Sequence, residues 1–166
     1  ASCLVGSEMC IRDSPNADPE ILVAIGDLTT SLGSADITEI EFISTAFDQS
    51  AGGQIQVRVR FNEAVDVNVS GGTPSLAITN GNQGTGSGRG PHAAAYASGT
   101  GTNELVFSIT IAAGQTTIVE DDVLVIGANA ISLNSGTIKD AGTSTNSTIT
   151  NVEAIGTAAG SITAVA

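Results

Sequence analysis

Two stretches of this chain place an apolar residue at every second position, the pattern of a β-strand with one buried face and one wet face. The first stretch covers residues 54–61 and the second covers residues 105–111. Because antiparallel sheets commonly pack on one face only, we predict that both are half-buried strands of an antiparallel sheet. The apolar positions are Ile55, Val57, Val59 and Phe61 in the first stretch and Leu105, Phe107, Ile109 and Ile111 in the second.

Shorter apolar runs, separated by turn residues, fill most of the remaining chain. The turn signals include Asn80-Gly81 and the segment Gly71-Gly72-Thr73-Pro74. Between the runs there is no amphipathic helix of roughly ten residues, which a parallel α/β fold would need. Many short strands at this spacing predict an all-β fold, an antiparallel β-sandwich over residues 37–166. The weaker predicted strands are Ile37–Ser44, Val65–Val69, Ser75–Thr79, Ala93–Ala97, Val123–Ile126 and Ser161–Val165.

Composition narrows the class of protein further. The 166 residues carry 17 acids against 5 bases, and this balance excludes a phosphate-binding surface built on clustered lysine and arginine, so we expect no nucleic-acid partner. No apolar run approaches the roughly 20 residues that cross a bilayer, so we expect no membrane insertion. With 3% aromatic residues and no Trp, the core has to be aliphatic.

The first 36 residues differ from the rest of the chain. Residues 1–14 hold both cysteines and the only methionine, and Cys3–Ser14 resembles the translation of a sequencing-library adapter. We therefore interpret residues 1–14 as an artefact or a disordered leader and exclude them from fold reasoning. Residues 15–36 form either an extended arm or a short helix, which would begin at Asp18-Pro19-Glu20 with Asp18 as N-cap.

Several ordered segments resemble one unit of a bacterial immunoglobulin-like repeat. The resemblance covers roughly residues 37–142 and implies an immunoglobulin-like β-sandwich in which Phe61 and Phe107 anchor the core and Tyr96 buries its ring with the hydroxyl free to bond. Such repeats fill giant cell-surface proteins of cyanobacteria and other marine bacteria, and similar single units occur in structural proteins of marine tailed phages. The segments that carry the resemblance are Val57–Val65, Gly72–Leu76, Ala95–Asn103, Leu105–Phe107 and Asn134–Gly142.

The resemblance implies display or assembly rather than catalysis. A single unit followed by a terminal strand suits a stand-alone, non-enzymatic virion component, such as a decoration, fibre or tail-associated protein on the virion surface. A module of a bacterial cell-surface adhesin and an accessory module of a secreted hydrolase are the alternatives, and these would be extracellular or on the cell surface. Each interpretation implies protein partners, namely capsid, tail or cell-surface proteins, or a second copy of the chain.

Candidate site residues are few. His92 is the only histidine, so neither a Cys/His nucleophile pair nor a zinc site can be assembled after Pro15. The glycine-rich loop Gly81–Gly90 is interpreted in two ways: as a mobile hairpin tip, or as a contact loop that presents Arg89 and His92 to a neighbouring protein.

The three consecutive acids Glu120, Asp121 and Asp122 are the one candidate metal site in the sequence. Carboxylate and carbonyl oxygens at a strand entry are ligands that Ca²⁺ accepts. The alternative is that they are solvated acids of a turn, because no EF-hand or nonapeptide calcium pattern is present. Apart from this candidate Ca²⁺, we expect no cofactor.

Overall fold

The two alternating stretches form the two longest strands of the fold, which pair with each other. The computed structural model describes residues 9–11, 21–23, 33–80 and 89–166. In it, β5 (Gly53–Asn68) pairs antiparallel with β8 (Thr102–Ile111), with Val57 opposite Phe107. The predicted apolar faces are confirmed: Ile55, Val57, Val59, Phe61, Leu105, Phe107 and Ile111 are buried, and Ile109 is half-buried.

Strand β5 is longer than predicted and joins two predicted strands into one. Residues 54–61 and 65–68 belong to the same strand, with an irregularity in the pairing to β8 between Arg60 and Val65. Along its other edge, β5 pairs with two different strands, one before residues 62–64 and one after them. Strand β3 (Ile37–Phe42) pairs antiparallel with the first half of β5, and β11 (Thr137–Asp140) pairs antiparallel with its last residues.

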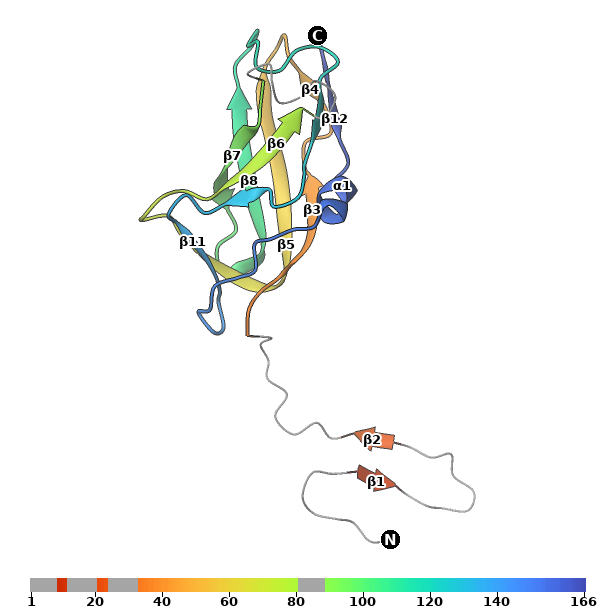
Figure 1. The fold of residues 1–166 in the computed structure, drawn as a ribbon, viewed down its shortest axis with the longest axis vertical. Coiled ribbons are helices and arrows are strands. Elements are labelled where there is room, and N and C mark those ends of the chain that lie inside the picture. The colour runs from red at the N-terminus through yellow and green to blue at the C-terminus, as the bar shows by residue number, and fades with distance from the viewer. Residues whose placement is uncertain (1–8, 12–20, 24–32, 81–88) are drawn as a thin grey trace. The chain divides into compact units, whose positions relative to one another are not determined.

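The remaining strands extend this pair into one sheet that curls around a single core (Figure 1). Its main path runs β11-β5-β8-β7-β6-β9-β12-β4, and β10 pairs beside β6. Strand β4, at the far end of the path, contacts β5, so the sheet partly closes on itself. These strands are β4 (Phe47–Asp48), β6 (Ser75–Asn80), β7 (His92–Ser98), β9 (Val123–Val125), β10 (Ile131–Ser132) and β12 (Ile162–Val165).

The all-β prediction is confirmed, but the prediction of a purely antiparallel arrangement is wrong. Strand β12 pairs parallel with β4, with Ala164 opposite Phe47, so the sheet is mixed. The pairing brings the end of the described chain beside a strand that lies more than a hundred positions earlier in the sequence. Nothing in a local pattern specifies such a partner, because periodicity predicts strands and not their neighbours.

The sequence analysis missed the shortest elements. Strands β4, β10 and β11 are only 2, 2 and 4 residues long, too short to show a period. The one helix in the described part of the chain, α1 (Glu153–Ala158), packs beside β3. Its Gly156 packs against the backbone of the residues that follow β9. A Cβ added to Gly156 would lie 2.5 Å from the Ile126 carbonyl oxygen. Glycine at this position therefore permits the close helix–strand approach.

The core is aliphatic with three aromatic anchors, as the composition predicts. Phe47, Phe61 and Phe107 are at most 3% exposed. Tyr96 packs edge-on against Phe107, with ring centroids 6.1 Å apart and an interplanar angle of 74°. Tyr96 is half-buried rather than enclosed as predicted, and its hydroxyl accepts a hydrogen bond from the Thr100 N–H at 2.9 Å.

The N-terminal segment forms a separate unit, residues 1–30, of which two short strands are described. Strands β1 (Met9–Ile11) and β2 (Ile21–Val23) pair antiparallel. Residues 21–23 are therefore extended, whereas the rest of the helix predicted from Asp18 onward lies outside the described residues. None of the helices in the described ranges is long and apolar enough to cross a membrane.

Candidate functional site

Three of the sequence-predicted site residues, Arg89, His92 and Asp122, meet in a buried polar cluster, which we define as these three together with Asn80. Asp122 precedes β9 and is 0% exposed. Its Oδ1 lies 3.3 Å from the Arg89 guanidinium, and its Oδ2 accepts hydrogen bonds from the Asn80 side-chain amide at 3.0 Å and the Val119 N–H at 2.9 Å. The guanidinium and these two donors balance a carboxylate that burial would otherwise destabilise.

The same contacts specify the orientation of Asn80 and the tautomer of His92. Because the Asn80 amide nitrogen donates to Asp122, its Oδ1 has to face His92, whose Nε2 lies 3.0 Å away. An amide oxygen can only accept, so His92 carries its proton on Nε2. His92 is 7% exposed, and it is placed opposite Ile78 where β7 begins beside β6.

The hypothesis that Arg89 and His92 are presented outward to a neighbour is not supported by this geometry. The Arg89 side chain is 20% exposed and points to Asp122, and the His92 ring is enclosed and bonded to Asn80. Both side chains therefore hold β6, β7 and the entry to β9 together. Residues 81–88 of the predicted loop lie outside the described part of the chain.

The structure also corrects the prediction that Glu120, Asp121 and Asp122 bind Ca²⁺ together. Glu120 and Asp121 are exposed, whereas Asp122 is buried against Arg89. Asp121 has a φ of 67°, so the backbone turns between these neighbours. Among the described residues, no group of three or more His, Cys, Asp or Glu side chains is arranged to hold a metal ion.

Burial lowers the pKa of His92, against the opposing effect of the Asp122 carboxylate. The folded state then disfavours the charged ring, so between the folded and unfolded pKa values the unfolded chain binds more protons. Above about pH 6.5 the ring is mainly neutral in both states, so we expect His92 ionisation not to reduce the free energy of unfolding there. We expect that free energy to fall as the pH drops below this value. The measurement is urea unfolding at about pH 7.5 and about pH 5.5.

His92→Gln is the matched variant for this pH dependence, because a glutamine amide can still donate to Asn80. The chain has a single histidine, so the variant should lose the fall in stability between these two pH values. An unchanged fall in the variant would show that another group titrates in this window.

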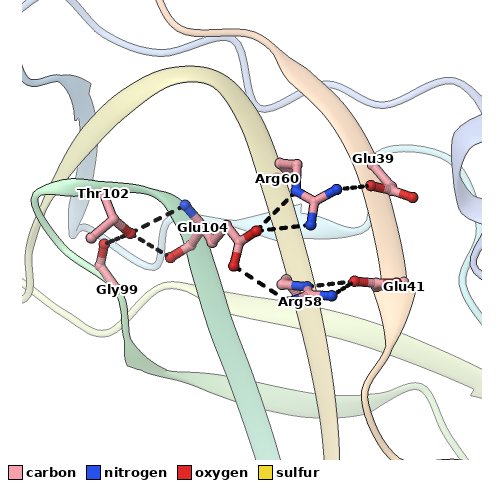
Figure 2. A network of polar contacts seen from close by, with 7 residues as sticks. All are labelled: Glu39, Glu41, Arg58, Arg60, Gly99, Thr102 and Glu104. Carbon is pink, nitrogen blue, oxygen red and sulfur yellow. Dashed lines mark hydrogen bonds and ion pairs between the residues drawn. The ribbon is translucent and has the colours of Figure 1, made fainter.

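A second polar feature, the charge lattice, covers the outer face of β3, β5 and β8. We define it as Glu39, Glu41, Arg58, Arg60 and Glu104, and Figure 2 shows the two arginines between Glu104 on one side and the two β3 acids on the other. Arg60 bonds Glu39 at 2.6 Å and Glu104 at 2.8 Å, while Arg58 bonds Glu41 and lies 3.4 Å from Glu104.

The register explains why these charges meet. Glu39 lies directly opposite Arg60, Glu41 opposite Arg58, and Arg60 opposite Glu104 on the other side. Opposite charges at directly facing positions stabilise a sheet modestly. The sequence analysis placed Arg58 and Arg60 on the wet face but did not pair them. The signal was the matching period of two in Glu39 and Glu41, two acids that could face two arginines.

The lattice and the buried cluster together neutralise most of the described positive charge. Three of the four described basic side chains, Arg58, Arg60 and Arg89, are in ion pairs with carboxylates. Their guanidinium groups are therefore used to join strands. Fixed charges along the face of β3 also resist unspecific pairing with another sheet.

The hydrogen bond from Arg60 lowers the pKa of Glu104, with the nearby Arg58 charge acting in the same direction. The lowered pKa means that this ion pairing stabilises the fold above the ordinary glutamate pKa and is lost as the pH falls through the folded value. We expect Glu104→Gln to cause a small loss of stability at neutral pH that disappears in high salt, because half-exposed ion pairs are screened. Urea unfolding at low and high NaCl measures it.

Glu120→Gln, which removes an exposed acid outside the lattice, is the control for this substitution. It should leave stability and its salt dependence unchanged. Equal effects of the two substitutions would mean that the lattice contributes only through the net charge of the molecule.

Comparisons with known proteins add no family assignment. No protein-family model matches the chain, and neither the curated proteins nor the solved structures contain a match. The resemblance to immunoglobulin-like repeats therefore rests on the sequence motifs.

Proposed function

We propose that this chain is a non-catalytic structural protein whose immunoglobulin-like domain is displayed on the outside of a particle, as a virion component of a marine tailed phage. The observation that carries the proposal is that the polar side chains considered as candidate site residues make contacts within the fold. The single histidine, three arginines and the buried Asp122 all join strands to one another within the fold. Side chains committed to structural contacts suit a scaffold whose surface is used for assembly.

The assignment to the immunoglobulin-like class is supported by the order of the motifs along the chain. The five segments that resemble the repeat fall in or between β5, β6, β7, β8 and β11, which belong to one curled sheet. The two phenylalanines that the resemblance makes core anchors, Phe61 and Phe107, are 1% and 0% exposed. A small domain with an aliphatic core and a charge-covered outer face suits repeated display in aqueous surroundings.

The experiment is mass spectrometry of density-purified virus particles and, in parallel, of cell envelopes from the same source. With only 5 Lys and Arg residues, trypsin would give few and long peptides, so cleavage after the 17 acidic residues is the better digestion. We expect peptides of residues 37–166 to be enriched together with capsid and tail proteins.

Two other results would contradict the proposal. Enrichment in envelopes, as part of a longer chain, would make this domain a module of a cell-surface adhesin. A hydrolase activity in the purified protein that His92→Gln abolishes, without loss of folding, would assign it to a secreted enzyme instead.

A further inference from the structure

A groove of about 510 Å³ lies between strand β3 and helix α1. In the described part of the chain β3 pairs with β5 alone, and α1 packs beside it (Figure 1). The groove therefore borders the outermost strand of the charge lattice. Its helix side is apolar and its sheet side is polar: Ala154, Ile155 and Ala158 line the first, and Thr38, Glu39 and Arg60 line the second.

The charge lattice changes sign from strand to strand and ends in acids at β3. Glu104 on β8 is followed by Arg60 on β5 and then by Glu39 on β3, and ion pairs join each to the next. With three acids against two arginines, the lattice carries one net negative charge. Opposite charges at neighbouring positions across a sheet attract, so a cation on the far side of β3 would continue the alternation.

Each of the two β3 acids has one oxygen left for such a cation. Glu39 accepts a hydrogen bond from Arg60 through Oε2, and Glu41 accepts one from Arg58 through Oε1. Within the described residues, the other oxygen of each carboxylate accepts no hydrogen bond. The two side chains are 46% and 34% exposed, so a partner can reach both. Because they are two positions apart on one strand, their backbone positions are about 7 Å apart.

The groove beside Glu39 matches the amphipathic character of a lysine or arginine side chain. Such a side chain lays its apolar stem on apolar surface while its cationic head stays at a polar site. Ala154, Ile155 and Ala158 offer the surface for the stem, and Glu39 offers a carboxylate for the head. Arginine suits the site best, because its planar guanidinium carries several donors and it is enriched at the centres of protein interfaces.

The cation has to come from a different protein. Two copies of this chain each carry a formal charge of -12 and repel one another. The two described bases that are two positions apart, Arg58 and Arg60, are both bonded within the lattice. Lys139 is the only base of β11. A basic partner, by contrast, is attracted by the field of the whole molecule.

We propose that the groove between β3 and α1 docks an extended basic segment of a partner protein. Two Lys or Arg residues of that segment, two positions apart, pair with the second oxygens of Glu39 and Glu41. The stem of the residue beside Glu39 lies along Ala154 and Ala158. The inference gives the chemistry of the partner and not its location, so its failure would leave the proposed display on a virion untouched.

The test is an NMR titration of the isotope-labelled full chain with a synthetic peptide amide that alternates arginine with threonine. At about pH 7.5 and about 50 mM NaCl, screening is weak enough for exposed ion pairs to contribute. We expect amide shifts concentrated in β3 and α1 and a Kd of about 1 mM or lower. A peptide of the same composition with its arginines in one block should bind several-fold more weakly, because neighbouring residues of an extended segment point to opposite faces.

Glu39→Gln combined with Glu41→Gln should weaken binding of the alternating peptide about tenfold, because it removes two half-exposed ion pairs with the peptide. The lattice contacts that these substitutions also weaken are half-exposed, so the fold should remain intact, which Tm checks. The charge-matched control is Glu120→Gln combined with Asp121→Asn, two exposed acids outside the groove, and it should bind like the wild type. Ala158→Leu keeps both acids but fills the groove, so it should also weaken binding.

Four results would overturn the proposal. The absence of amide shifts in β3 and α1 up to about 10 mM peptide would mean that the groove binds no basic segment, because this concentration is well above the expected Kd. Equal weakening by the control pair of substitutions would reduce the binding to general attraction by an acidic molecule. Equal binding of the block peptide would contradict the spacing of the two cations. Unchanged binding in Ala158→Leu would show that the segment does not enter the groove.

Discussion

Phe107→Ala should lower the free energy of unfolding by about 3–5 kcal/mol, the range for truncating a fully buried aromatic ring. Phe107 is 0% exposed, lies opposite Val57 on β5 and receives the edge-on ring of Tyr96. Removing its ring leaves a cavity in a core that has few other aromatic rings to fill it, and Tyr96 loses its aromatic contact. Urea unfolding, with the slope m unchanged, measures the loss.

Thr110→Ala is the control on the same strand. Thr110 is exposed on the opposite face of β8, so its truncation should change stability by no more than about 0.5 kcal/mol. A loss below about 1 kcal/mol for Phe107→Ala would contradict the assignment of the buried face of β8, and with it the pairing to β5.

The buried face of β5 and of β8 could be predicted because it follows from the local sequence pattern. Alternate residues of a strand point to opposite faces, so a period of two in residues 54–61 specifies which side chains are buried before any partner is known. The partners of β5 could not be predicted in this way. This edge pairs with β3 before Asn62 and with β11 from Val65 onward, and a local pattern does not show where one partner gives way to the other.

The candidate sites were harder to predict because they join residues far apart in the sequence. Asn80 meets Asp122 across 42 positions, and Arg89 pairs with the same carboxylate from the other end of the loop that follows Asn80. Three acids in a row, residues 120–122, suggested a metal site because sequence proximity was taken for proximity in space. In the structure the backbone turns at Asp121, and the third acid is buried against Arg89 while the first two are exposed.

Arg89→Ala should lower the free energy of unfolding by about 3–5 kcal/mol, because it removes the counter-charge of a carboxylate that has no access to water. Asp122 is 0% exposed, and the Arg89 guanidinium 3.3 Å away is the positive charge paired with it. The hydrogen bonds from Asn80 and Val119 remain in the variant, but neither donor carries a charge. Urea unfolding at neutral pH gives the loss.

A double-mutant cycle separates the ion pair from the packing of the arginine side chain. Asp122→Asn removes the buried charge but keeps an oxygen that can accept from Asn80 and Val119. In that background, adding Arg89→Ala should cost less than it does alone, with a coupling energy of about 0.5–3 kcal/mol. Arg60→Ala, which breaks half-exposed ion pairs of the charge lattice, should cost much less than Arg89→Ala. Equal losses for the two arginines would contradict a special dependence of Asp122 on Arg89, and would reduce the buried cluster to a set of neutral hydrogen bonds.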